Sequence, residues 1–237
     1  WLLLVSGAVG GPALQDGDRI VLVGDTLIER DARYSWIESG LLVASPARNL
    51  VVRNLGWSGD TPAGLSRAYF DSAEVGFQRL VDQVQACKPT VIVVGYGMAS
   101  ALDGVPVDQF LSELRHFVES VQPAPRAWVF LSPIESTLST HPDDAKRLAS
   151  TLSAYADGMK KFASEKKATY IDVRSIATKS TCREPGGIHL SDAGYRELAE
   201  VVAHHLVPAK SPATSAASDA IERLRAKLYR KNSLYFE

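Results

Sequence analysis

The stretch Val91-Ile92-Val93-Val94, followed at once by Gly95, decides the fold class of this sequence. Its four aliphatic residues are continuous and do not alternate with polar ones, which is typical of a strand buried on both faces of a parallel sheet. Comparable short runs rich in β-branched residues occur at four other places in the chain. Together they predict five strands, at residues 19–24, 50–54, 90–95, 127–132 and 169–173.

Longer segments with helical periodicity separate the predicted strands. Helices are expected at residues 27–44, 72–86, 107–121, 143–166 and 192–205. Pro106 and Pro142 favour helix starts, because a first helical turn tolerates proline. Alternating strands and helices are the signature of parallel βαβ units. The sequence therefore predicts a three-layer α/β domain, in which helices cover both faces of a doubly wound, parallel, five-stranded sheet, with ligands at the carboxyl ends of the strands.

Length and composition fit one large domain with a continuous core, since 46% of the 237 residues are hydrophobic and 22% are charged. The formal net charge is −1, and the basic residues are scattered along the chain. This pattern excludes the basic footprint of a protein that binds nucleic acid or an acidic membrane. The expected partner is a neutral small molecule or a glycan.

The two ends of the chain differ in composition from the central domain, which we assign to residues 19–207. Residues 1–18 begin with an apolar run that fits either the remnant of a signal peptide or an ordinary apolar arm. A membrane span needs about 20 apolar residues, and this run is shorter. Residues 208–218 predict a linker, and residues 219–237 predict an amphipathic helix. We expect an exported protein, periplasmic or extracellular, that is part of a longer chain.

Cys87 and Cys182 are too few for a disulfide scaffold or a zinc cluster. Pairing and free thiols both remain open, and the low count favours free thiols. No metal and no cofactor is expected. A flavodoxin-like cofactor binder would suit the strand pattern. However, the turn after the first strand lacks a glycine-rich phosphate loop, and Asp25 in that turn would repel a phosphate.

The segment after the first strand, Gly24-Asp25-Thr26-Leu27, forms what we call the first block. It places a hydroxyl at the start of a helix, where the helix dipole favours developing negative charge. Thr26 is therefore a candidate nucleophile. The alternative is that Asp25 or Thr26 only caps the helix, because both residue types are preferred caps.

Three more segments follow later strands. The second block, residues 54–60, reads Asn-Leu-Gly-Trp-Ser-Gly-Asp and offers backbone N–H groups that could face an anion. The third block, residues 97–100, reads Gly-Met-Ala-Ser. The last block, residues 186–190, reads Gly-Gly-Ile-His-Leu and supplies His189. In a doubly wound fold ligands bind at the carboxyl ends of the strands, so these segments are the informative ones.

In this order the four blocks resemble those of the SGNH/GDSL hydrolase superfamily, and the resemblance covers most of residues 19–206. It implies a flavodoxin-like fold with strand order 2-1-3-4-5 and the hydrolysis of esters. The family's nucleophilic serine falls on Thr26 and its histidine base on His189. Its two oxyanion donors, a glycine and an asparagine, fall on Gly59 and Ala99. The aspartate that orients the histidine falls on Gly186.

Three polar groups of the family are thus replaced in this chain, at positions 26, 99 and 186. Loss of an oxyanion donor costs about 100- to 1,000-fold in turnover, and loss of an orienting carboxylate about 10,000-fold. Threonine keeps a hydroxyl, but its methyl group restricts the rotamer. Glu184 and Asp192 are the two nearby carboxylates that could orient His189 instead.

Two functions remain open. The first is a weak hydrolase of acylated carbohydrates or small esters. Its site residues are Thr26, His189 and Gly59 for catalysis and Asp25, Trp57, Met98 and Ala99 for substrate binding. The alternative is a catalytically inactive relative that serves as a ligand-binding or structural module of a larger exported protein. In that case Trp57, Tyr96 and Met98 would form an apolar floor. The missing polar groups favour impaired catalysis over efficient catalysis.

Overall fold

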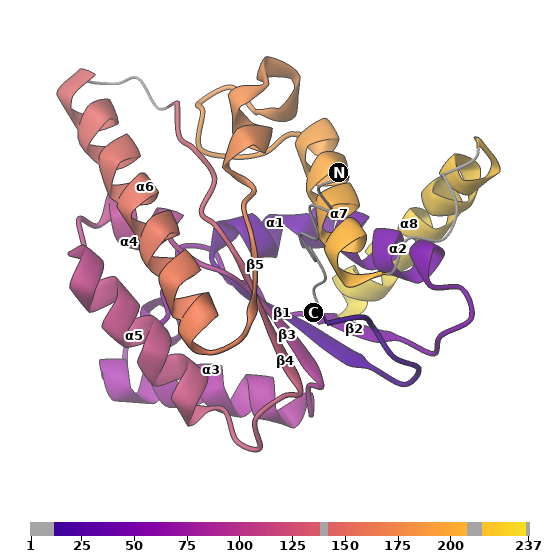
Figure 1. The fold of residues 1–237 in the computed structure, drawn as a ribbon, viewed down its shortest axis with the longest axis horizontal. Helices are drawn as coiled ribbons and strands as arrows, with labels where there is room; N and C mark the ends of the chain where they lie inside the picture. Colours follow the sequence, from indigo (N-terminus) through magenta and orange to yellow (C-terminus); the bar gives the residue numbers. More distant parts are fainter. Residues whose placement is uncertain (1–11, 138–141, 208–214, 236–237) are drawn as a thin grey trace, which may run out of the picture.

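The computed structural model describes residues 12–137, 142–207 and 215–235, and contains one parallel sheet (Figure 1). Its strands are β1 (Arg19–Gly24), β2 (Val51–Asn54), β3 (Val91–Gly95), β4 (Ala127–Leu131) and β5 (Thr169–Ile171). They pair in the order β2-β1-β3-β4-β5, which confirms the expected order. Strand β3 is buried along its whole length, as its continuous aliphatic run predicts.

Helices cover both faces of the sheet, so the three predicted layers are present. One side carries α3 (Ala73–Ala86), α5 (Val107–Ser120) and α6 (Pro142–Glu165), and the other carries α2 (Trp36–Ala44) and α7 (Asp192–Leu206) (Figure 1). Helix α1 (Thr26–Tyr34) begins directly after β1 and contacts it. This arrangement brings the residues that follow β1, β2 and β3 to one edge of the sheet.

The single helix expected over residues 27–44 is wrong, because the chain breaks it into α1 and α2 at Ser35. Ser35 adopts a left-handed conformation with φ of 56°, and its N–H donates to the carbonyl oxygen of Asp31. The Asp31 carboxylate accepts from the N–H of Ile37 at 3.2 Å and so caps the second helix. Burial of this carboxylate raises its pKa to about 7. Hydrophobic periodicity does not detect such a break, because the apolar spacing continues across it.

Several short elements were not predicted from the sequence. They are α4 (Met98–Leu102) and three 3₁₀ helices, Leu65–Arg67, Arg174–Thr178 and Ser180–Cys182. Strand β5 ends at Ile171, two residues before its expected end. These elements span three to five residues each, which is too short for a periodic pattern to identify.

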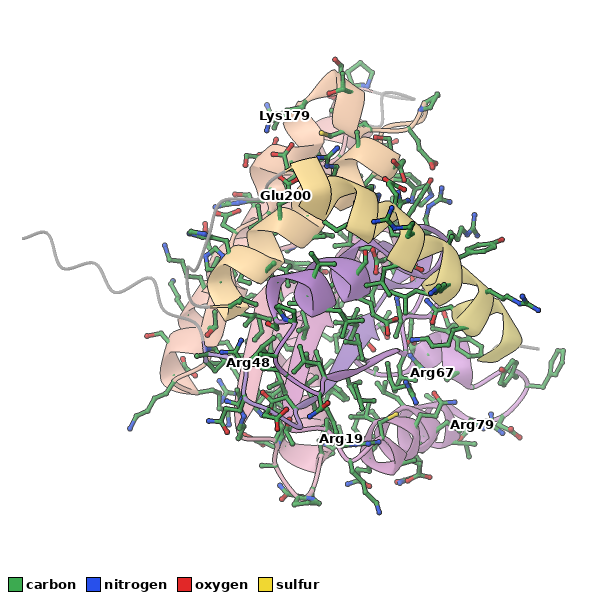
Figure 2. The ribbon with its side chains drawn as sticks, turned by 90° about the vertical axis from the view of Figure 1, so that its right-hand side faces the viewer. Arg19, Arg48, Arg67, Arg79, Lys179 and Glu200 are labelled. Atoms are coloured by element: carbon green, nitrogen blue, oxygen red, sulfur yellow. The ribbon has the colours of Figure 1, made fainter. Side chains whose placement is uncertain are left out.

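The C-terminal helix α8 (Ser215–Tyr235) lies across α1 and α2 on the outside of that layer (Figures 1 and 2). It starts four residues before the helix expected at 219–237. Leu228 is buried, and the Arg225 guanidinium lies 3.6 Å from the centre of the Trp36 ring. Lys231 Nζ pairs with Glu38 Oε1 at 2.6 Å. Contacts of these three kinds attach α8 to the domain.

Residues 1–11 of the expected N-terminal arm, and residues 208–214 of the expected linker, lie outside the described part of the chain. Both cysteines are buried and free in the structure. None of the described helices combines the length and the apolar character that a membrane crossing requires.

Candidate active site

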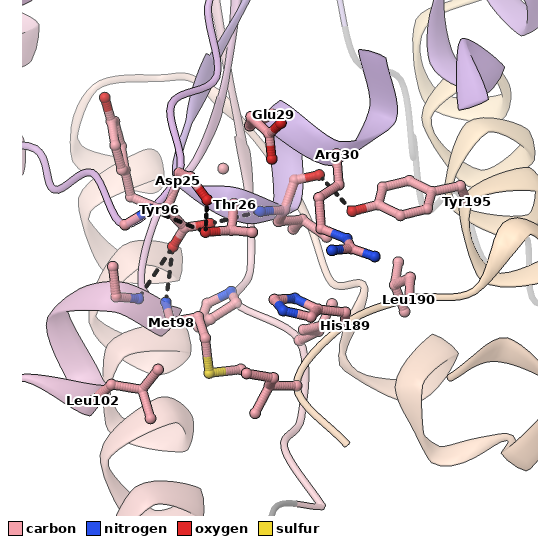
Figure 3. Close-up of a pocket in the computed structure, with 18 of the residues that line it drawn as sticks. Asp25, Thr26, Glu29, Arg30, Tyr96, Met98, Leu102, His189, Leu190 and Tyr195 are labelled. Carbon is pink, nitrogen blue, oxygen red and sulfur yellow. Dashed lines mark hydrogen bonds between the residues drawn. The ribbon is translucent and has the colours of Figure 1, made fainter. Parts of the chain in front are cut away.

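A cavity of about 320 Å³ opens where the four blocks meet at the carboxyl edge of the sheet (Figure 3). Thr26, Gly59, Ala99 and His189 all line it, although they come from four separate parts of the sequence. Most of the remaining wall is apolar. It is supplied by residues that include Met98, Leu102, Pro133, Ile134 and Ile188. The cavity therefore brings the candidate catalytic residues together beside an apolar space.

The hydroxyl of Thr26 forms hydrogen bonds with the second block. The N–H of Gly59 donates to Thr26 Oγ1 at 3.0 Å, and Ser58 Oγ lies 3.3 Å from the same oxygen. Gly59 has φ of 69°, a left-handed conformation that glycine adopts without a steric penalty. The Ser66 hydroxyl donates to the Gly59 carbonyl oxygen at 2.8 Å and helps to hold this turn. The N–H group expected to stabilise an oxyanion thus lies beside the candidate nucleophile.

Asp25 fastens the first block to the third block. One of its carboxylate oxygens accepts from the N–H of Leu27 at 3.0 Å and caps α1. The other accepts from the N–H groups of Gly97 at 3.1 Å and Met98 at 3.0 Å, at the start of α4. Burial raises the pKa of Asp25 to about 6, although these N–H groups oppose the shift. Asp25 borders the cavity, but its carboxylate is engaged with the backbone.

A buried ion pair supports the second block from behind. Arg67 is 1% exposed, and its Nε donates to Asp60 Oδ2 at 2.8 Å. The same guanidinium donates to the Leu55 carbonyl oxygen at 2.7 Å and to the side chain of Gln83. The hydroxyl of Tyr96, a residue that borders the cavity, donates to Asp60 Oδ2 at 3.3 Å. Arg67 therefore ties both ends of the turn that presents the Gly59 N–H.

His189 has no orienting partner among the described residues. Its ring is half-buried, and no described side chain or backbone group forms a hydrogen bond with it. Gly186, where the family has its aspartate, has φ of 111°, and a Cβ built there would meet nothing within 4 Å. Burial lowers the pKa of His189 below 6.5, and the positive charge of Arg30 lowers it further. The imidazole is therefore neutral near pH 7 and able to accept a proton.

Both carboxylates proposed to orient His189 are held by other groups. Glu184 Oε1 accepts from Arg30 Nη2 at 2.5 Å and from the Tyr34 hydroxyl at 3.1 Å. Asp192 Oδ1 accepts from Trp36 Nε1 at 2.9 Å and from Arg225 Nη2 at 2.7 Å. Neither carboxylate binds the ring of His189, which consequently lacks an enforced tautomer.

Replacing Arg30 with glutamine is expected to raise the pKa of His189. The substitution removes a nearby positive charge and releases the Glu184 carboxylate, and both changes favour the protonated imidazole. Because a general base works only when deprotonated, the acid limb of any His189-dependent rate then moves to higher pH. An NMR titration of the imidazole Cε1–Hε1 signal measures the shift directly, with His189→Ala to assign it among the five histidines. Arg115→Gln, on α5, is the matched control, and an unchanged or lower pKa in Arg30→Gln would contradict the electrostatic argument.

Several residues of the cavity were not expected from the sequence, chiefly Ser58 and three charged residues of α1. Glu29, Arg30 and Arg33 border the cavity together with Thr26. They follow Thr26 by three, four and seven residues, which places all four on one face of the helix. This spacing could have identified the three charged residues as neighbours of Thr26 from the sequence alone.

Trp57, expected to contact the substrate, does not border this cavity. Its ring lies 5.3 Å from the Arg67 guanidinium and packs edge-on against Tyr69 at 5.9 Å. It borders a neighbouring cavity together with Tyr229. Tyr96 and Met98, by contrast, do line the cavity of Thr26.

No group of three potential metal-binding side chains occurs within the residues that the structure describes. The cavity sets a hydroxyl, an imidazole and a backbone N–H group beside an apolar wall. This set of groups is the minimum for nucleophilic attack on an acyl carbon.

Solved structures with the same fold include several esterases. A catalytic variant of Axe2, an acetylxylan esterase from Geobacillus stearothermophilus, superposes with a TM-score of 0.67 at 17% identity, covering 83% of this chain and 99% of that one. A putative lipolytic protein of the G-D-S-L family from Desulfitobacterium hafniense DCB-2 gives 0.58 at 18% identity, covering 80% and 99%. LAE5, an alpha/beta hydrolase enzyme from the metagenome of Lake Arreo in Spain, gives 0.65 at 16% identity, covering 88% and 98%. At these identities the likeness is one of fold.

The sequence itself carries the family assignment. No curated protein matches this chain in a sequence search. Residues 22–197, however, match the GDSL-like lipase/acylhydrolase family, and this segment includes all four blocks and the residues around the cavity. The chain therefore belongs to the GDSL-like lipase/acylhydrolase family.

Proposed function

We propose that this protein is a weak ester hydrolase that acts on acylated carbohydrates or other small esters. The observation that carries the proposal is the Gly59 N–H at 3.0 Å from Thr26 Oγ1, in a cavity that His189 also borders. In this mechanism Thr26 Oγ1 attacks the ester carbonyl carbon while His189 takes its proton. The Gly59 N–H stabilises the oxyanion, and His189 then returns the proton to the departing alcohol. Water hydrolyses the acyl-threonine in the second half of the cycle.

The same geometry explains why we expect the rate to be low. Thr26 Oγ1 is bonded to Gly59 and Ser58 in the resting state, and His189 is not oriented by a carboxylate. Ala99 contributes no side-chain donor to the oxyanion. An oxyanion donor and an orienting carboxylate are thus missing. Such groups typically account for factors of about 100 to 10,000 in turnover, although these factors do not simply multiply.

The second candidate is a family member that has lost catalysis and only binds its ligand. The engagement of Glu184 with Arg30 and Tyr34, and of Asp192 with Trp36, favours it, because it removes both nearby substitutes for the missing aspartate.

Initial rates of 4-nitrophenyl acetate hydrolysis distinguish the two candidates. The wild-type protein is expected to exceed the buffer rate, and Thr26→Ala and His189→Ala are each expected to return the rate to background. Thr178→Ala and His204→Ala change the same residue types at exposed positions outside the cavity, and these controls should behave as wild type. If all five proteins hydrolyse the ester equally slowly, the hydrolase proposal fails and the binding function remains.

A further inference from the structure

A second cavity of about 380 Å³ adjoins the cavity of Thr26. It lies between α1, the second block and α8. Glu29, Arg33 and Ser58 border both cavities, so the two spaces meet at Ser58, whose hydroxyl is 3.3 Å from Thr26 Oγ1. A ligand whose ester lies at Thr26 would therefore extend past Ser58 into this second space, which we call the flanking cavity.

Two aromatic side chains border the flanking cavity. Trp57 comes from the second block and is held in place by Tyr69 at 5.9 Å and the Arg67 guanidinium at 5.3 Å. Tyr229 comes from α8 and is 55% exposed, which is high for so large a side chain. Aromatic rings with an accessible surface offer an apolar contact area at a low cost in conformational entropy. The flanking cavity thus presents apolar platforms to a ligand.

The polar groups of the flanking cavity carry opposite charges. Glu29 Oε2 is buried and has no hydrogen-bond partner among the described residues. Glu29 Oε1 lies 3.7 Å from Arg33 Nη2, and the Asn232 amide completes the polar lining. A carboxylate at the wall of a cavity accepts strong hydrogen bonds, so a ligand that donates hydrogen bonds would be favoured there. The same carboxylate disfavours a hydrocarbon chain by desolvation.

We propose that the flanking cavity binds the saccharide part of a neutral glycan ester, with α8 as its outer wall. A sugar ring has an apolar face for Trp57 or Tyr229 and hydroxyl groups for Glu29 and Asn232. The acyl group occupies the apolar side of the first cavity, beside Met98 and Leu102. Figure 3 shows Glu29 on one side of Thr26 and these two residues on the other. The assignment of the two cavities rests on the function proposed above.

Helix α8 is attached firmly enough to serve as a wall. Arg225 Nε donates to the Tyr34 carbonyl oxygen at 2.7 Å, and Asn232 Nδ2 donates to Ser35 Oγ at 3.3 Å. Both bonds end at the break between α1 and α2. The helix lies beyond the segment that matches the family, residues 22–197. The outer wall of the subsite therefore lies outside the segment that matches the family, whereas its other walls lie within it.

Isothermal titration calorimetry with xylotriose and cellotriose tests the proposal without requiring catalysis, because neither sugar carries an ester. We expect at least one of the two to bind the wild-type protein, and Tyr229→Ala to weaken that binding about 3- to 10-fold through loss of an aromatic platform. Tyr229→Phe keeps the ring and should bind within about twofold of wild type. Lys227→Ala, an exposed position on the same helix outside the cavity, controls for effects on α8 itself.

The outcomes distinguish the subsite proposal from the hydrolase proposal. If neither sugar binds, or if Tyr229→Ala binds like wild type, the subsite is overturned, whatever the esterase assay gives. If binding depends on Tyr229 while 4-nitrophenyl acetate is not hydrolysed, the subsite stands and the hydrolase proposal alone fails. His204→Ala should bind xylotriose or cellotriose as wild type does, because His204 borders neither cavity.

Discussion

Replacing Arg67 with methionine is expected to lower the free energy of unfolding by about 3 to 5 kcal/mol at pH 8, the cost typical of removing one partner from a buried ion pair. Arg67 and Asp60 are 1% and 0% exposed, so the substitution leaves a carboxylate without its counter-ion in the interior. It also removes the donor to the Leu55 carbonyl oxygen at 2.7 Å. Urea denaturation, followed by circular dichroism, gives the difference.

The pH dependence of this loss identifies its cause. Burial already raises the pKa of Asp60 above 3.8, and the Arg67 charge opposes that shift. Removing the charge raises the pKa further, so the variant's deficit is largest at high pH and shrinks as the pH falls and Asp60 becomes protonated. Arg147→Met, which breaks the exposed pair with Asp144, should cost less than about 1 kcal/mol. A deficit in Arg67→Met that is small, or that does not change with pH, would mean that lost packing and not the uncompensated carboxylate governs this site.

The sheet could be predicted from the sequence because burial on both faces dictates composition. A strand such as Val91–Gly95 has no polar face, and its aliphatic run is visible without any knowledge of its neighbours. The break at Ser35 could not be predicted in the same way. It depends on the Asp31 side chain turning to the N–H of Ile37, and the apolar spacing on either side continues as in an unbroken helix.

The candidate site, too, could be predicted from the sequence only in part. The resemblance of the four blocks to those of the family makes Thr26, Gly59 and His189 candidates, and the structure brings all three to one cavity. What surrounds His189 depends on contacts between distant residues. Glu184 lies five residues before it in sequence, yet its carboxylate is taken by Arg30 and Tyr34, which lie about 150 residues away along the chain. The local sequence shows that a carboxylate lies near His189. It does not show which other side chains bind that carboxylate.

Rebuilding the oxyanion hole is expected to produce the largest gain in activity. The double variant Thr26→Ser, Ala99→Asn should hydrolyse 4-nitrophenyl acetate about 100- to 1,000-fold faster than wild type, the factor typical of one oxyanion donor. Ala99 borders the cavity with Thr26 and Gly59, and its backbone is fixed through the contact of its N–H with Asp25 at 3.4 Å. Thr26→Ser alone should change the rate little, because the new hydroxyl would still have one donor and an unoriented base.

Placing an aspartate at position 186 is expected to strain the backbone. Gly186 has φ of 111°, a conformation that residues with a side chain rarely adopt, although space for a Cβ exists. We expect Gly186→Asp to lower stability by about 1 to 3 kcal/mol. Any gain in orientation of His189 is therefore accompanied by a local strain that a melting curve would register.

The gain from Ala99→Asn should persist in part when His189 is removed, because oxyanion stabilisation continues to act when a member of the catalytic triad is lost. Comparing Ala99→Asn with and without His189→Ala, both on the Thr26→Ser background, separates the donor from the base. Ala99→Leu on that background has nearly the shape of asparagine without its amide N–H, and it should give no gain. If leucine raises the rate as much as asparagine does, the improvement comes from reshaping the cavity, and the incomplete oxyanion hole is not what limits this protein.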